Sequence, residues 1–245
     1  MLEVCNLNKS FGGVQVAVDI NLKLKEGERR SILGPNGAGK TTLFNLLAGT
    51  LAPDSGAILF QGKNITSLNI EKRARLGISR SFQRNFLFDD FTIRENLLLA
   101  ASAAQGTTTW LWRDGFNHSR VRATVEQVAE QLALADLLDT PVKSVSYGNR
   151  RQLELGIALA SKPRILLLDE PTSGIGPAMM ESFHALITAL PRELTILIVE
   201  HDFDLVFKVA DYITVLNFGA IVYEGTPQET KKSPKVRDIY LGSSK

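Results

Sequence analysis

The sequence predicts an α/β fold with an antiparallel β region at its N-terminus and a helical region inserted into its core. Apolar and polar residues alternate over the first 30 residues as they do in strands, with turns at Gly12–Gly13 and Glu26–Gly27. Strand patterns fade between about Asp89 and Ala160, where helical spacing takes over. They return in three later segments, 164–169, 195–200 and 213–216. An insertion within one α/β core explains this order better than two tandem domains.

The core starts with a short buried strand, 31–33, that runs into a glycine-rich loop. A helix is expected to follow over 41–51 and to end near Pro53, and another strand is expected over 57–61.

Apolar spacing in the inserted region predicts helices over 93–104 and 121–138, joined by an irregular stretch, 105–117. We therefore expect a single domain over residues 1–245. Its core comprises 1–88 and 161–245, and its helical subdomain comprises 89–160.

Composition excludes several classes of protein. A net charge of +2 gives no strong field, so charge alone implies neither nucleic acid nor an anionic membrane as a partner. The single cysteine, Cys5, cannot form an internal disulfide and fits a reducing compartment. No apolar run approaches the roughly 18–20 residues that span a bilayer, and the N-terminus does not resemble a signal peptide. We expect a cytosolic protein; if it works at a membrane, another chain carries the spanning segments.

The segment Gly34–Thr42 reads Gly-Pro-Asn-Gly-Ala-Gly-Lys-Thr-Thr and matches G-x-x-x-x-G-K-[ST] between an expected strand and an expected helix. Its glycines let backbone N–H groups converge on phosphate oxygens, and the helix N-terminus adds partial positive charge. Lys40 can reach the outer phosphates, and the Thr41 hydroxyl can ligate Mg²⁺. This segment predicts a nucleotide phosphate site.

Acidic residues end the apolar strand Ile165–Glu170. A carboxylate at the carboxyl end of a strand beside a phosphate loop can hold Mg²⁺ through water, which suits Asp169. Glu170 is then placed to orient or deprotonate an attacking water. The later strand Thr195–Glu200 is followed by His201, a candidate contact to the γ-phosphate.

Two further segments carry candidate residues. Gln83 lies at the boundary between the core and the helical insertion, where a side chain that reaches the metal would couple the two parts. Ser146 is a good N-cap for a helix that starts beyond a turn at Tyr147–Gly148. Taken alone, this helix start offers no nucleophile, base or metal-ligand spacing.

Together these segments resemble the ATPase subunits of ATP-binding-cassette transporters, over essentially the whole chain. The order is that of the family: phosphate loop, Gln83, helical insertion, the signature Val145-Ser-Tyr-Gly-Asn149, Asp169–Glu170 and His201. The resemblance implies a P-loop NTPase core of the RecA-like type, with ATP and Mg²⁺ as cofactors. It also implies two subunits that sandwich ATP head to tail, each aiming its signature helix at the nucleotide held by its partner.

The resemblance assigns roles to residues of this chain. Catalysis falls to Lys40, Glu170 and His201, and the metal ligands are Thr41, Gln83 and Asp169. The expected nucleotide contacts are Phe11, Gly34, Pro35, Asn36, Gly37, Ala38, Gly39, Lys40, Thr41, Thr42, Gln83, Ser146 and Gly148, of which Ser146 and Gly148 act across the dimer. Phe11 falls where an aromatic ring stacks on adenine; a strand-core aromatic is the alternative interpretation.

Finer features are similar to the branched-chain amino-acid uptake branch. These are the Ser-Tyr-Gly signature, the run Arg75–Gln83 and the closing run Val236–Gly242. That branch implies an importer with integral-membrane permease subunits, a second ATPase subunit and a solute-binding protein, and a location on the cytoplasmic side of the inner membrane. An ATPase of lipopolysaccharide export and a soluble, non-transport cassette ATPase remain as alternatives. A GTPase is disfavoured because no Asn-Lys-x-Asp base-reading motif is present.

Three positions depart from the family pattern. Gly176 replaces an Asp or Asn in the segment that crosses the dimer interface, Tyr147 replaces Gly, and Asn149 replaces Gln or Glu. A side chain at 147 is tolerable only if the backbone keeps φ negative. The hydrolytic residues are intact, so we expect an active ATPase.

Phenylalanines at the boundary of the insertion suggest where a membrane partner docks. Phe86, Phe88 and Phe91 could supply an apolar groove for a short partner helix, or they could be core residues. The sequence leaves both interpretations open.

Overall fold

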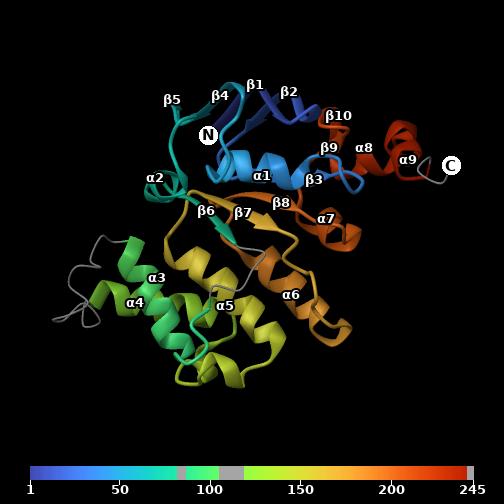
Figure 1. Cartoon of the computed structure of the whole chain (residues 1–245). Coiled ribbons are helices and arrows are strands. Elements are labelled where there is room, and N and C mark those ends of the chain that lie inside the picture. Colours follow the sequence, from blue (N-terminus) through green and yellow to red (C-terminus); the bar gives the residue numbers. More distant parts are fainter. Residues whose placement is uncertain (82–86, 105–118, 242–245) are drawn as a thin grey trace. The chain divides into compact units, whose positions relative to one another are not determined.

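The computed structural model describes residues 1–81, 87–104 and 119–241 (Figure 1). The chain divides into two compact units. The first comprises Met1–Arg73, Leu167–Glu170 and Arg192–Lys245, and the second comprises Ala74–Leu166 and Pro171–Pro191. The predicted helical insertion, 89–160, lies within the second unit, which also takes in the segment after Glu170.

An antiparallel sheet at the N-terminus belongs to the first unit. Among the described residues it has the order β2-β1-β4-β5, formed by β1 (Leu2–Phe11), β2 (Val14–Leu24), β4 (Ser55–Phe60) and β5 (Lys63–Asn64). Leu2 lies opposite Leu24 on one side and Phe60 on the other, and all three are buried. The alternation over the first 30 residues therefore marks a sheet with one buried face, which confirms the predicted antiparallel region.

The second sheet is the α/β core, with the strand order β10-β9-β3-β8-β7-β6 among the described residues. Its strands are β3 (Arg29–Leu33), β6 (Ile78–Ser81), β7 (Ile165–Asp169), β8 (Thr195–Val199), β9 (Tyr212–Asn217) and β10 (Ala220–Gly225). The central strand β3 pairs in parallel with both β8 and β9. Every residue of β3, β7 and β8 is buried. Burial on both faces is why β7 and β8 read as short apolar runs, whereas β3 begins with the buried polar residues Arg29, Arg30 and Ser31. The predicted α/β fold class is confirmed.

Helices of the first unit are α1 (Lys40–Ala48), α2 (Ile70–Arg75, of which the first four residues belong to this unit), α7 (Phe203–Val209), α8 (Pro227–Lys232) and α9 (Pro234–Leu241). The predicted end of the first helix near Pro53 is wrong, because α1 ends at Ala48 and Gly49 caps it at φ 81°. The buried Arg73 guanidinium donates to the carbonyls of Leu46 (2.6 Å) and Leu47 (2.8 Å), which satisfies the last turn of α1.

Helices of the second unit are α3 (Ile93–Ala104), α4 (Ser119–Gln131), α5 (Tyr147–Ala160) and α6 (Pro177–Ala189), with single 3₁₀ turns at Ala135–Leu137 and Val142–Ser144. Figure 1 shows α3, α4 and α5 as neighbouring helices of one bundle. The helix predicted over 93–104 is confirmed. The helix predicted over 121–138 is too long, because α4 ends at Gln131 and Ala133 adopts φ 54°.

The start of α5 also differs from the prediction. Tyr147 and Gly148 are the first residues of the helix and not a turn before it, and Ser146 is its N-cap. The predicted irregular stretch, 105–117, lies outside the described residues. None of the described helices has the length and apolar character that crossing a bilayer requires.

Candidate nucleotide site

Lys40 closes the phosphate loop from the first position of α1. Its Nζ donates to the carbonyl oxygens of Gly34 (2.6 Å) and Pro35 (3.0 Å), so the side chain curls back over the loop that precedes it. Lys40 as a whole residue is only 6% exposed. Burial lowers the pKa of Lys40, and the nearby carboxylates of Glu170 and Asp169 oppose this shift. The structure thus brings the loop lysine and the two acids at the carboxyl end of β7 into one electrostatic environment.

Two glycines allow the loop to pack against neighbouring backbone. Gly39 is the N-cap of α1 at φ 101°, and a Cβ atom there would lie 2.4 Å from the carbonyl oxygen of Val16. A Cβ atom on Gly34 would lie 2.3 Å from the carbonyl oxygen of Leu216. Neither backbone neighbour can move aside as a flexible side chain does. Glycine is therefore required at both ends of the loop, for reasons that exist before any ligand binds.

The middle of the loop is more accessible. Asn36 and Gly37 are exposed, Pro35 is partly exposed, and Ala38 is buried. Thr41 is exposed in the first turn of α1, and the Thr42 side chain is partly buried. The predicted phosphate contacts therefore form one contiguous loop and helix start.

Glu170 and His201 meet at the carboxyl ends of two neighbouring strands. His201 Nε2 lies 3.1 Å from Glu170 Oε1, and the backbone N–H of Glu170 donates to the carbonyl of Val199 (2.8 Å). Glu170 holds φ 48°, an unfavourable conformation for a residue with a side chain. Its carboxylate contacts His201, and Asp169 is buried at the end of β7. The structure brings these three predicted residues together.

Phe11 lies at the end of β1 and is 51% exposed, with the Lys9 ammonium 5.7 Å from the centre of its ring. It is not a core residue, so the strand-core interpretation is wrong. An exposed ring remains available for stacking on a flat ligand.

The signature segment lies in the second unit. The Ser146 hydroxyl accepts from the backbone N–H of Asn149 (3.2 Å) and donates to the Asn149 side-chain oxygen (2.5 Å). Asn149 is therefore long enough to hold the capping serine, although it is shorter than the Gln or Glu of the family pattern. Tyr147 is helical, so its side chain causes no backbone strain. Ser146 is the N-cap of α5, and Gly148 is the second residue of the helix. Gln83 and Phe86 lie outside the described residues.

Comparison with known proteins identifies the family. Residues 17–173 match the family described as ABC transporter. The chain belongs to the ABC transporter family. It is accordingly a nucleotide-binding ATPase of the ATP-binding-cassette type.

Relatives of known function align over the full chain. It is 38% identical to the high-affinity branched-chain amino acid transport ATP-binding protein BraF of Pseudomonas aeruginosa, over 100% of this chain and 98% of that protein. It is 35% identical to the corresponding protein LivG of Escherichia coli, with the same coverage.

Solved structures agree with the family. A cassette of an ABC transporter in its ADP conformation is 29% identical with a TM-score of 0.83, over 99% of this chain and 98% of that one. The structure of cbiO1 from Clostridium perfringens, part of an ABC transporter complex, is 30% identical with a TM-score of 0.80, over 98% of this chain and 94% of that one.

Sequence reasoning missed two features beside the phosphate loop. Burial raises the pKa of the Tyr240 hydroxyl on α9, and a hydrogen bond from the backbone N–H of Gly34 opposes part of this shift. The loop also lines a cavity of about 630 Å³ together with Phe218, Val222 and Ile239. The closing run Val236–Gly242 indicated a branch of the family, but no sequence pattern predicts that Tyr240 contacts the loop.

Proposed function

We propose that this chain is the ATP-hydrolysing subunit of an importer for branched-chain or related amino acids, with separate membrane subunits. The observation that carries the proposal is full-length identity of 35–38% to ATP-binding proteins of that transport class. The chain's own residues support the ATPase part, since the phosphate loop, Asp169, Glu170 and His201 are all present and grouped. In this proposal the membrane subunits and the solute-binding protein select the solute.

In this proposal the phosphate loop holds the nucleotide. Backbone N–H groups of the loop, among them those of Gly37 and Gly39, and the N-terminus of α1 bind the phosphates, and Lys40 exchanges its bonds to Gly34 and Pro35 for the outer phosphate oxygens. Phe11 stacks on the adenine ring with its exposed face. Thr42, next to Thr41 in the first turn, contributes a second hydroxyl to the phosphate oxygens.

The donors beside the phosphate loop suit Mg²⁺. No cluster of three or more His, Cys, Asp or Glu side chains among the described residues could hold a metal by itself. A hydroxyl from Thr41 and a carboxylate from Asp169 are instead the few oxygen ligands that Mg²⁺ takes when phosphate oxygens and water complete its shell. Bound there, Mg²⁺ would neutralise phosphate charge. Gln83 is the third proposed ligand.

Glu170 is the proposed general base or water-orienting residue, and His201 the proposed contact to the γ-phosphate. The strained backbone of Glu170 and its 3.1 Å approach to His201 support these roles, because both side chains then face the same reacting centre. Ser146 and Gly148 are proposed to complete the γ-phosphate site of a second ATPase subunit through the N-terminus of α5.

The remaining partners follow from the same proposal. Permease subunits in the membrane and a solute-binding protein complete the transporter, and the chain sits peripherally on the cytoplasmic side of the inner membrane. Phe88 and Phe91 are 56% and 42% exposed and stack with ring centres 5.3 Å apart, which supports a docking surface for a permease helix rather than a core role.

Uptake measurements test the proposed substrate class. Cells that lack this chain should lose uptake of labelled leucine, isoleucine and valine, and the wild-type chain should restore it. Glu170→Gln should not restore uptake although it still binds ATP, because it blocks hydrolysis and not binding. Unchanged uptake in the deletion strain would remove the amino-acid assignment.

Capture of the permease subunits tests the docking surface. Phe88→Asp with Phe91→Asp should reduce capture, because charges replace an exposed apolar pair. Phe218→Asp is the matched control, since Phe218 is also exposed but lies on the β9–β10 turn of the first unit. Equal capture by both variants would count against the surface.

A further inference from the structure

The first turn of α5 is bonded to the segment that follows Glu170 in the chain. The Tyr147 hydroxyl donates to the carbonyl of Ser173 at 3.2 Å. Both residues belong to the second unit. Tyr147 is one of the positions where this chain departs from the glycine of the family pattern, so the bond comes from the departure itself.

Arg151, one turn further along α5, makes a second bond to the same carbonyl. Its guanidinium donates to Ser173 O at 3.2 Å and lies 5.3 Å from the centre of the Tyr147 ring. A partly buried ion pair with Glu154 (2.7 Å) holds the guanidinium in place. A carbonyl oxygen has two lone pairs, so these two donors use both of them.

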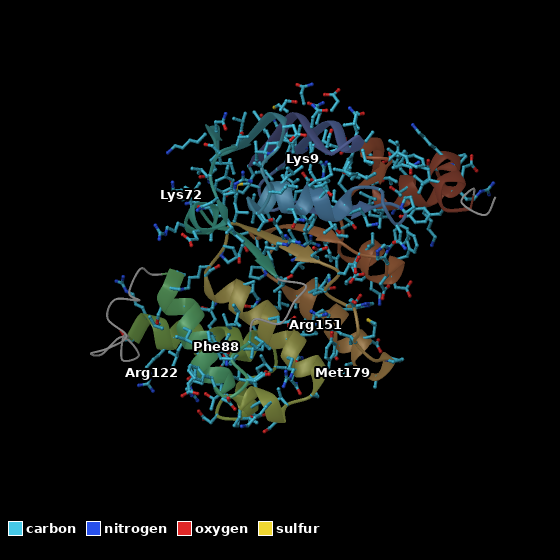
Figure 2. The ribbon with its side chains drawn as sticks, viewed as in Figure 1. Lys9, Lys72, Phe88, Arg122, Arg151 and Met179 are labelled. Carbon is cyan, nitrogen blue, oxygen red and sulfur yellow. The ribbon has the colours of Figure 1, made fainter. Side chains whose placement is uncertain are left out.

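Two glycine contacts complete the junction. A Cβ atom on Gly174, which has φ 78°, would lie 2.8–3.0 Å from the Tyr147 hydroxyl and ring carbons. In the opposite direction, a Cβ atom on Gly148 would lie 2.3 Å from the Met179 sulfur. Each segment therefore supplies one glycine and one large side chain to the other. Figure 2 labels Arg151 on α5 and Met179 on α6, the helices that carry these contacts.

The junction joins two pieces of the chain that matter for hydrolysis. Ser146 directly precedes Tyr147, and Glu170 stands three residues before Ser173. If the proposed function is right, Ser146 serves the nucleotide of the partner subunit, whereas Glu170 acts on the nucleotide of this one. A rigid junction between the residues that follow Ser146 and those that follow Glu170 would transmit a change at one ATP site to the other.

We propose that Tyr147 is a positioning residue that, with Arg151, clamps Ser173–Gly174 to the first turn of α5 and so couples the two ATP sites of the transporter. The inference rests on the proposed function. It assigns Tyr147 no contact with ATP.

Amide hydrogen exchange of the isolated full chain tests the clamp itself. Tyr147→Gly should speed exchange in peptides that cover 172–179, because it removes the hydroxyl bond and the ring over Gly174. Tyr147→Phe should have a smaller effect, since it keeps the ring. Tyr223→Phe on β10 is the matched control and should leave these peptides unchanged. Exchange at the wild-type rate in Tyr147→Gly would overturn the clamp.

Steady-state kinetics of the assembled transporter test the coupling. Tyr147→Gly should lower kcat and the Hill coefficient for ATP, with kcat about fivefold to tenfold down and KM within about twofold of wild type. The kcat and Hill coefficient of Tyr147→Phe should fall between those of wild type and those of Tyr147→Gly. Wild-type kcat and cooperativity, or a rise in KM that accounts for the whole loss, would overturn the proposal. A wild-type complex with no ATPase activity would instead overturn the proposed function, so the two failures are distinct.

A double-variant cycle separates the steric contact from general damage. Gly174→Ala should be harmful because its Cβ meets the Tyr147 ring, and because φ 78° is unfavourable for alanine. The strain at φ 78° is the same in either background, so it cancels in the cycle. Gly174→Ala should therefore slow hydrolysis less in the Tyr147→Gly background than in wild type. Equal losses in both backgrounds would show that the ring does not rest on Gly174.

Discussion

The phosphate loop and the signature segment are both glycine-containing helix starts, but they are held by different kinds of contact. The glycines that begin and end the phosphate loop pack against backbone carbonyls, those of Leu216 and Val16. The signature segment packs through side chains, with Met179 on Gly148 and Tyr147 on Gly174.

The two helix caps differ in the same way. Gly39 caps α1 without a side-chain bond, and Lys40 closes the loop onto its own carbonyls. Ser146 caps α5 with its hydroxyl, and Asn149 returns the bond. Backbone contacts leave no freedom for substitution, whereas side-chain contacts can be rebuilt from other residues. This explains why the phosphate loop matches its pattern fully while the signature of this chain departs from the common one.

The largest effect is expected from Lys40→Ala. The variant should lose at least about 100-fold in ATPase activity and bind ATP poorly even as an isolated chain, because the loop loses its only side-chain cation. Lys72→Ala, at the exposed lysine labelled in Figure 2, is the control and should behave as wild type. Binding of a fluorescent ATP analogue and phosphate release measure both properties. Normal binding by Lys40→Ala would contradict the role of the loop.

Ser146→Arg should impair the signature segment and leave the phosphate loop of the same chain intact. If the signature acts only across the dimer, the isolated chain should still bind ATP with wild-type affinity, while the assembled transporter loses roughly 100-fold in hydrolysis. The same two assays measure this. Wild-type hydrolysis by a transporter that carries the change in each cassette would remove the role of Ser146 in the partner's site.

A methyl group added to a glycine should lower the free energy of unfolding more in the phosphate loop than in the signature segment. Gly39→Ala forces a Cβ against the Val16 carbonyl at φ 101°, so unfolding should become easier by about 2 kcal/mol or more. Gly148→Ala meets only the tip of the flexible Met179 side chain and should cost about 1 kcal/mol or less. Urea unfolding of the two variants decides the point. Equal costs would contradict the distinction between backbone and side-chain packing.

Gly176→Asp should have the smallest effect. A Cβ atom at this position meets nothing within 4 Å, and the backbone φ of −71° suits any residue. An aspartate at the N-cap position of α6 should therefore leave the free energy of unfolding unchanged or raise it by about 1 kcal/mol. Thermal unfolding measures this directly. A clear loss of stability would contradict this prediction, because it would mean that the fold cannot accommodate a side chain at position 176.

Much of the fold was predictable because its strands carry strong local signals. The antiparallel region, the core strands β3, β7, β8 and β9 and the helix over 93–104 follow from alternation and apolar runs, whereas the core strands β6 and β10 were not predicted. Helix ends were less predictable. Leu51 and Leu138 continue apolar spacing past the points where Gly49 and Ala133 take positive φ and end the helices. The spacing of side chains does not report backbone conformation.

By itself the sequence predicted the chemistry of the nucleotide site, because that chemistry depends on residue types in a contiguous loop and at strand ends. Only the tertiary structure decided which residues meet. It brought His201 to Glu170 across two strands, exposed Phe11, and placed Tyr147 and Arg151 on the Ser173 carbonyl. The physical reason is that such contacts join residues 22–31 positions apart, and packing rather than local sequence selects them.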